Sequence, residues 1–145
     1  METTFTKIAR KTNSKPLSCK CQACKKQCET APCLGTPEDI EKLIDAGYGS
    51  KIFATTWASG IVLGIIDYPI EMYQAEFVPR HGCIFFKDGL CQLHDLGLKP
   101  TEGKLSHHAV KTINHPNKHL SWAVAKEWLA PENAEIIKRI KQKYT

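Results

Sequence analysis

The spacing of its cysteines constrains this chain more than any other feature of its sequence. Seven cysteines occur in 145 residues, five of them between residues 19 and 33: Cys19, Cys21, Cys24, Cys28, Cys33, Cys83 and Cys91. A domain of this length buries roughly 70% of the surface of its unfolded chain, so it can form a hydrophobic core without covalent cross-links. The cysteines therefore need another explanation than disulfide stabilisation.

The first residues and the longest uncharged stretch indicate a cytoplasmic protein without a membrane partner. Residues 1–16 are polar and basic and lack the apolar run of a secretory signal. Residues 52–66 are uncharged but shorter than the roughly 20 apolar residues that a membrane helix needs, so we expect them to be buried. The cytosol keeps thiols reduced, and an odd number of cysteines cannot all pair. Metal ligation is therefore favoured over disulfide bonds.

Two cysteine pairs have the arrangement of metal half-sites. Cys21 and Cys24 are separated by two residues, a spacing that lets two thiolates of one loop reach the same ion. Cys83 and Cys91 flank a predicted hairpin, which we expect to bring them towards each other. Tetrahedral sites are often built from two such pairs, so a four-thiolate site is one prediction.

Cys28 and Cys33 add two more thiols to the first loop, and the spacing leaves three alternatives open. They could help to form a two-metal site, complete a [4Fe–4S] cluster with Cys21 and Cys24, or be spare. The cofactor is accordingly predicted to be a zinc or iron ion, or alternatively a [4Fe–4S] cluster. The predicted metal ligands are Cys21, Cys24, Cys28, Cys33, Cys83 and Cys91.

Other interpretations of these residues were weighed. Cys83 precedes Ile-Phe-Phe and could simply be a small buried apolar side chain. A thioredoxin-like use of the CxxC pair is disfavoured because the pair lies among further cysteines before the first convincing helix. His94, His107 and His108 are candidate ligands but more often such imidazoles are exposed or hydrogen-bonded, so they stay outside the predicted set.

Local signals predict helices at both ends of a strand-rich middle. Thr36, Pro37 and Asp39 begin a helix that Gly47 ends. The runs IVLGII, MYQAEFV and CIFF predict short strands, and Asp88-Gly89 predicts a hairpin between CIFF and LCQL. Helices are predicted over 101–113, 117–129 and 131–143.

These elements predict one small α+β domain over residues 1–145, with cysteine-rich metal-binding loops, a short antiparallel sheet and flanking helices. Residues 1–17 are predicted to be a flexible basic arm. The net charge of +5 arises largely near the two ends, without interleaved aromatic residues. A solvated basic surface explains this pattern better than nucleic-acid binding. The tryptophans, Trp57, Trp122 and Trp128, are expected in the core.

The cysteine loop through the Thr36 helix, followed by CIFFKDGLCQLHDLGLKP, resembles the YkgJ-like cysteine-cluster family, whose domains are described as zinc- or iron-chelating. The resemblance covers residues 19–104. Cys21, Cys24, Cys28 and Cys33 match the cluster and Cys83 and Cys91 match the later pair. The family's adjacent cysteines are spread apart here, and its last cysteine falls at Gly103. The resemblance implies metal chelation.

Three functions remain open at this level. The first is a metal-binding protein whose ion is structural or is handed on. The second is an iron–sulfur enzyme that acts on another protein, although no cosubstrate motif is visible. The third is an interaction module in which the metal only folds a surface for a protein partner or, less in keeping with the charge pattern, a nucleic acid. The sequence contains no phosphate-binding glycine loop and no GxSxG or HExxH motif.

Overall fold

A two-stranded antiparallel sheet, surrounded by helices, forms the centre of the fold. The computed structural model describes residues 3–11, 34–62, 64, 66–78, 82–87, 90–93, 98–105 and 116–143. Strands β1 (Ile52–Trp57) and β2 (Ile70–Ala75) pair along their whole length, with Ile52 opposite Ala75 and Trp57 opposite Ile70. Together with the helices, this sheet confirms the predicted α+β class. The predicted cysteine-rich loop lies outside the described residues.

The helix before the sheet begins and ends where the sequence predicts. In α3 (Pro37–Leu43) the Thr36 hydroxyl accepts the Asp39 N–H and the Asp39 carboxylate accepts the Thr36 N–H, which is a complete capping box. The chain continues through a π-helical turn, η1 (Ile44–Tyr48), and a 3₁₀ turn, η2 (Gly49–Lys51). Gly47 has φ +98°, which a side chain would disfavour, and it ends the regular helix.

The segment between β1 and β2 contradicts the predicted strand IVLGII. Its first residues form a short helix, α4 (Ser59–Val62), and Gly64 has φ +74°. A Cβ atom at Gly60 would lie 2.7 Å from the Trp57 ring, so glycine lets α4 pack closely on this ring. The apolar run is not a buried strand either, since Val62 is 89% exposed. Tertiary packing has overridden the β propensity of its side chains.

Two short strand pairs follow β2. Strand β3 (Phe77–Val78) pairs with β4 (Gly82–Cys83), and β5 (Phe86–Lys87) pairs with β6 (Leu90–Cys91). Lys87 lies opposite Leu90, so the hairpin predicted around Asp88-Gly89 is confirmed, while these two residues lie outside the described part. The segment CIFF is not one strand, because a turn at Ile84–Phe85 separates β4 from β5.

The last part of the chain is helical, as predicted. Helix α5 (Thr101–Leu105) begins at the predicted residue, and the rest of the prediction over 101–113 lies outside the described residues. Helix α6 (Pro116–Ala125) continues into the 3₁₀ turn η3 (Lys126–Trp128). A second 3₁₀ turn, η4 (Pro131–Asn133), leads into α7 (Ala134–Gln142). Ile140 is fully buried on the α7 face that packs on α3.

A helix lies within the segment predicted to be a flexible basic arm. In α1 (Thr4–Lys11), Ile8 is buried in the core. Lys7 makes an ion pair of 3.0 Å with the buried carboxylate of Glu127 and thereby ties α1 to η3. The adjacent residues Lys7 and Ile8 therefore hold α1 on the domain, although the basic composition of this segment predicts a solvated arm.

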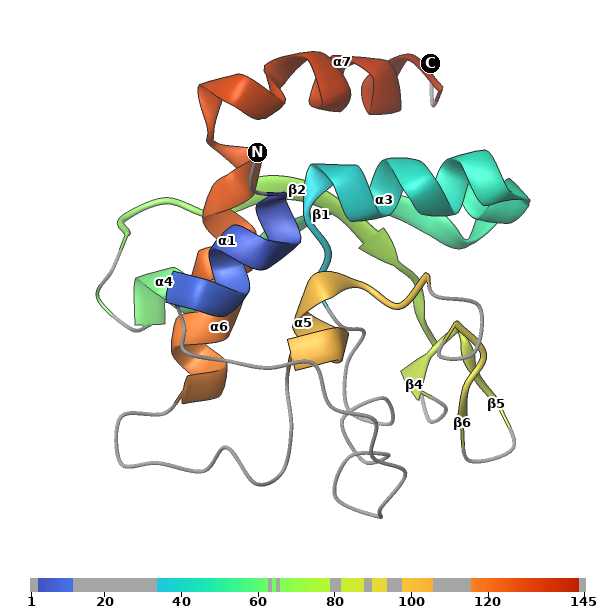
Figure 1. Cartoon of the computed structure of the whole chain (residues 1–145), viewed down its shortest axis with the longest axis horizontal. Helices are drawn as coiled ribbons and strands as arrows, with labels where there is room; N and C mark the ends of the chain where they lie inside the picture. Colours follow the sequence, from blue (N-terminus) through green and yellow to red (C-terminus); the bar gives the residue numbers. More distant parts are fainter. Residues whose placement is uncertain are drawn as a thin grey trace.

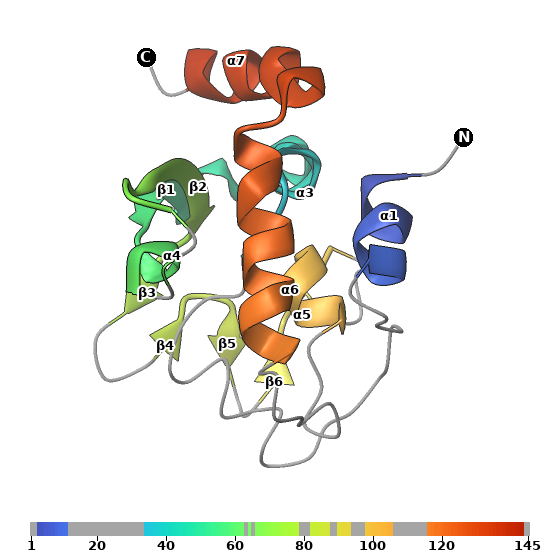
Figure 2. The ribbon, with the colours of Figure 1, turned by 90° about the vertical axis from the view of Figure 1, so that its left-hand side faces the viewer.

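The helices are arranged around α6 (Figures 1 and 2). Helix α6 runs through the middle of the molecule, with the β1–β2 sheet on one side and α1 and α5 on the other, and α7 crosses one end above α3. The buried ring of Trp57 stacks on Trp122 with 6.0 Å between ring centres, and Trp128 is also buried, as predicted. None of the described helices is long and apolar enough to cross a membrane.

Candidate functional site

The structure describes only part of the predicted ligand set. Four predicted ligands and the three histidine candidates lie outside the described residues: Cys21, Cys24, Cys28, Cys33, His94, His107 and His108. Cys83 lies in β4 and is buried, and Cys91 lies in β6. Within the described ranges, no group of three or more His, Cys, Asp or Glu side chains is positioned to hold a metal ion.

The residues that directly follow Cys33 are firmly held. Leu34 exchanges two hydrogen bonds with Glu102 of α5: its N–H donates to the carboxylate at 2.9 Å, and its carbonyl accepts the Glu102 N–H at 3.1 Å. The Gly35 carbonyl accepts the indole N–H of Trp128 at 2.8 Å. Residues 34–36 are all buried, so water does not compete for these bonds. We call residues 34–36 the anchor segment.

One carboxylate joins the anchor segment to both neighbouring helices. Asp39 Oδ2 accepts the Thr36 N–H at 2.9 Å, the Thr101 N–H at 2.8 Å and the Thr101 hydroxyl at 2.5 Å. The sequence predicts the first of these contacts as part of a helix cap, but nothing local predicts the two contacts across 62 residues of chain. A Cβ at Gly35 would lie 3.3 Å from Pro100, so the two segments also touch. The starts of α3 and α5 therefore form one unit.

The strands that carry Cys83 and Cys91 rest on a small aromatic core. The buried ring of Phe85, in the turn between β4 and β5, makes an edge contact with the Tyr48 ring, with 5.5 Å between ring centres. The backbone carbonyl of Phe85 accepts the Gln92 N–H at 2.8 Å. Cys83 is paired with Phe77, and Cys91 with Phe86. The two cysteines are thus on consecutive strand pairs and not opposite each other, which differs from the simple hairpin expected.

Both views place β4, β5, β6 and α5 in the half of the molecule away from α7 (Figures 1 and 2). The anchor segment joins this half to η3, because Leu34 is bonded to Glu102 of α5 and Gly35 to Trp128. Thiolates are the ligands preferred by zinc and by iron–sulfur clusters. Cys83 is buried, as both a metal ligand and a small apolar side chain can be.

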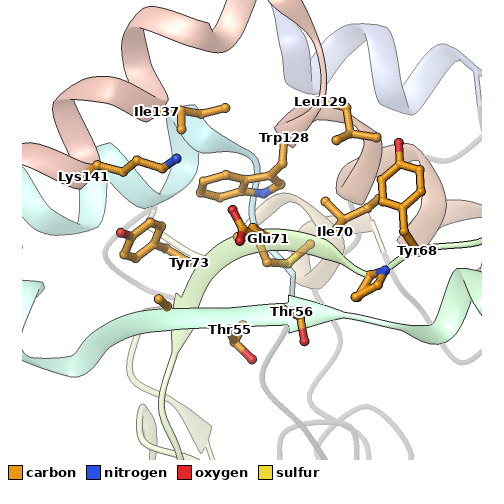
Figure 3. Close-up of a pocket in the computed structure, with 13 residues that line it drawn as sticks. Thr55, Thr56, Tyr68, Ile70, Glu71, Tyr73, Trp128, Leu129, Ile137 and Lys141 are labelled. Carbon is orange, nitrogen blue, oxygen red and sulfur yellow. The ribbon is translucent and has the colours of Figure 1, made fainter.

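A groove lies at the other end, between the β1–β2 sheet and α7 (Figure 3). Its main cavity has a volume of about 690 Å³ and a second hollow of about 510 Å³ continues it along α7. Both are lined by Trp128, Leu129, Ile137 and Lys141. Figure 3 shows Glu71 of β2 near the Trp128 ring, with Lys141 at one end of the groove and Tyr68 at the other. No local sequence pattern predicts this groove.

The basic residues of α7 fall into two groups. On the α3 side, Arg139 donates two hydrogen bonds to Glu41, at 2.8 and 3.1 Å, and Lys143 lies 2.8 Å from Asp45. The hydrogen bond from Arg139 holds the pKa of Glu41 below its ordinary value. On the groove side, Lys138 and Lys141 have no acidic partner within 4.0 Å among the described residues. The groove wall is therefore the uncompensated face of the helix.

Comparisons with family models, with curated proteins and with solved structures found no match to this chain. Its function is therefore inferred from its own residues. The two features that offer chemistry are the cysteines of the sequence, of which Cys83 and Cys91 lie on the strand pairs, and the groove below α7.

Proposed function

We propose that this protein binds a metal ion through cysteine thiolates, either zinc or iron, or that it holds a [4Fe–4S] cluster. The observation that carries the proposal is the set of cysteines in the sequence: four within residues 21–33 and two more on a hairpin region far along the chain. The resemblance to the YkgJ-like cysteine-cluster family supports the same function. We place the protein in the reducing cytosol, where these thiols stay available to a metal.

The anchor segment supports this proposal on energetic grounds. A metal site closes a loop, and the entropy cost of closure falls when one end of the loop is already fixed. Four hydrogen bonds with Glu102, Trp128 and Asp39 fix residues 34–36. Cys33 is covalently joined to this fixed end. A site that includes Cys33 would therefore need to order less chain than a site in a free loop.

Two of the ligand sets that the sequence allows differ in a testable way. In the first, Cys21 and Cys24 share one ion with Cys83 and Cys91, so that the ion joins the loop to the strand pairs. In the second, Cys21, Cys24, Cys28 and Cys33 hold the ion or cluster alone, and Cys83 is a buried apolar side chain. Thiolate ligation couples metal binding to folding in either case.

Serine substitution separates the two sets. Cys21→Ser should abolish stoichiometric metal binding in both, while Cys19→Ser, a neighbouring cysteine outside the predicted set, is the matched control and should retain the metal. Cys83→Ala should lose the metal only if the first set is right. Metal is measured per folded chain by elemental analysis, with circular dichroism to confirm the fold. Full metal content in Cys21→Ser would contradict the proposal.

A further inference from the structure

The groove offers an apolar floor that is open to solvent. Leu129 is 45% exposed and Tyr68 is 51% exposed, although both are large side chains of the kind that folding usually covers. The Trp128 ring, which packs 6.2 Å from Tyr73, and Ile137 of α7 also line the groove. Contact with these side chains would remove apolar surface from water on both molecules.

The walls of the groove carry charge of opposite sign. Lys138 and Lys141 are three residues apart on α7, so they lie on the same face of the helix. They differ from Arg139 and Lys143, whose charges are already compensated by acidic residues of the chain. On the sheet side Glu71 lines the groove and has no ion pair among the described residues. An anion is thus attracted to the α7 wall and repelled from the sheet wall.

We propose that this groove binds an extended acidic segment of a partner protein, in which carboxylates alternate with apolar side chains. The carboxylates would face Lys138 and Lys141, and the apolar side chains would cover Trp128, Leu129 and Ile137. Alternation fits because successive side chains of an extended chain point in opposite directions. The two hollows share four lining residues and therefore form one continuous surface along α7 for such a segment.

The charges disfavour two other ligands. A nucleic-acid backbone has phosphates along its whole length, and Glu71 would repel those nearest the sheet. A small enclosed ligand is normally buried on most of its surface, whereas Tyr68 and Leu129 leave this groove open at one end. A segment whose acidic groups all lie on one side avoids this repulsion, because those groups face the α7 wall and none faces Glu71 on the sheet wall. This proposal does not depend on the proposed metal site, because Cys83 is not among the described residues that line the groove.

The test uses the protein of residues 1–145 and a blocked hexapeptide of alternating glutamate and leucine, titrated by isothermal calorimetry. We expect the peptide to bind the wild-type protein and its affinity to fall about tenfold in the double variant Lys138→Gln, Lys141→Gln, because each exposed ion pair contributes modestly to the binding free energy. Leu129→Ser should weaken it independently, since this side chain is exposed and its loss leaves the fold intact. Lys143→Gln is the matched control, because Lys143 pairs with Asp45 away from the groove, and should bind as the wild type does.

Two further peptides make the result decisive. A lysine–leucine hexapeptide should not bind, and a glutamate–serine hexapeptide should bind more weakly than the glutamate–leucine one. The proposal is overturned by absence of binding at millimolar glutamate–leucine peptide, by equal binding of the lysine–leucine peptide, or by unchanged binding in the double lysine variant. Self-association in sedimentation velocity that the double variant abolishes would assign the groove to a second copy of the chain and would also overturn it.

Discussion

Removal of the Asp39 carboxylate is the most direct way to perturb the hydrogen bonds that hold the anchor segment next to α5. Asp39→Ala deletes the acceptor of three hydrogen bonds, from the Thr36 N–H, the Thr101 N–H and the Thr101 hydroxyl. Thr36 is 2% exposed and Thr101 is 1% exposed, so water has little access to the donors that are left. The bond from the Asp39 N–H to the Thr36 hydroxyl uses the backbone and survives the substitution.

The expected loss follows from these contacts. Each buried N–H that loses its acceptor costs about 1–3 kcal/mol, and the hydroxyl can turn to another partner, so the total is about 3–4 kcal/mol. For a domain of this size that corresponds to a fall in the melting temperature of roughly 10 °C. Asp39→Asn keeps one acceptor oxygen without the charge and should cost about half as much.

Urea unfolding followed by circular dichroism measures both variants. Asp45→Ala is the matched control, because Asp45 is exposed and makes an ion pair with Lys143, so its loss should change the free energy of unfolding by less than about 1 kcal/mol. If Asp39→Ala unfolds at the same urea concentration as Asp45→Ala, the hydrogen bonds of Asp39 between α3 and α5 contribute nothing to the free energy of unfolding. Asp39→Asn keeps the comparison measurable should the alanine variant fail to fold.

Three further changes test other parts of the fold. Gly47→Ala should destabilise by about 1 kcal/mol in urea unfolding, because φ is +98° and no neighbour within 4 Å can compensate. Arg139→Gln should be destabilising at neutral pH only. The lowered pKa of Glu41 contributes stability at pH values above its ordinary pKa of 4.5, and this stability is lost as the pH falls through the pKa of the folded state. The free energies of unfolding of the variant and the wild type should therefore converge in acid. Glu127→Gln leaves Lys7 without its buried partner and should cost about 2 kcal/mol, with faster amide hydrogen exchange in α1 than in α6; equal exchange in the two helices would refute this.

The elements predicted correctly are those with strong local signals. Thr36, Pro37 and Asp39 specify the start of α3 through backbone geometry and hydrogen bonds within four residues. Asp88-Gly89 predicts its hairpin for the same reason, since the turn needs residues that tolerate positive φ. The apolar stripe that includes Ile140 identifies α7. In each case the information lies within a few residues.

The features that were missed depend on contacts between distant residues. Helix α4 replaces a predicted strand because Gly60 admits the Trp57 ring, and α1 is fixed by Glu127, more than a hundred residues away. The second role of Asp39, at Thr101, also lies beyond any local pattern. The groove needs the sheet and α7 to meet, although the three-residue spacing of Lys138 and Lys141 does show that both lie on one helix face. The candidate ligands were found from their residue type and spacing alone.

The metal content of the wild-type protein tests the central claim most directly. The protein is purified without oxygen, its metals are measured by elemental analysis, its visible absorption is recorded, and its reactive thiols are titrated. We expect a stoichiometric metal with fewer than all seven thiols reactive: colourless protein with zinc, or brown protein with an iron–sulfur cluster. Folded protein that contains no stoichiometric metal and has seven reactive thiols would contradict the account.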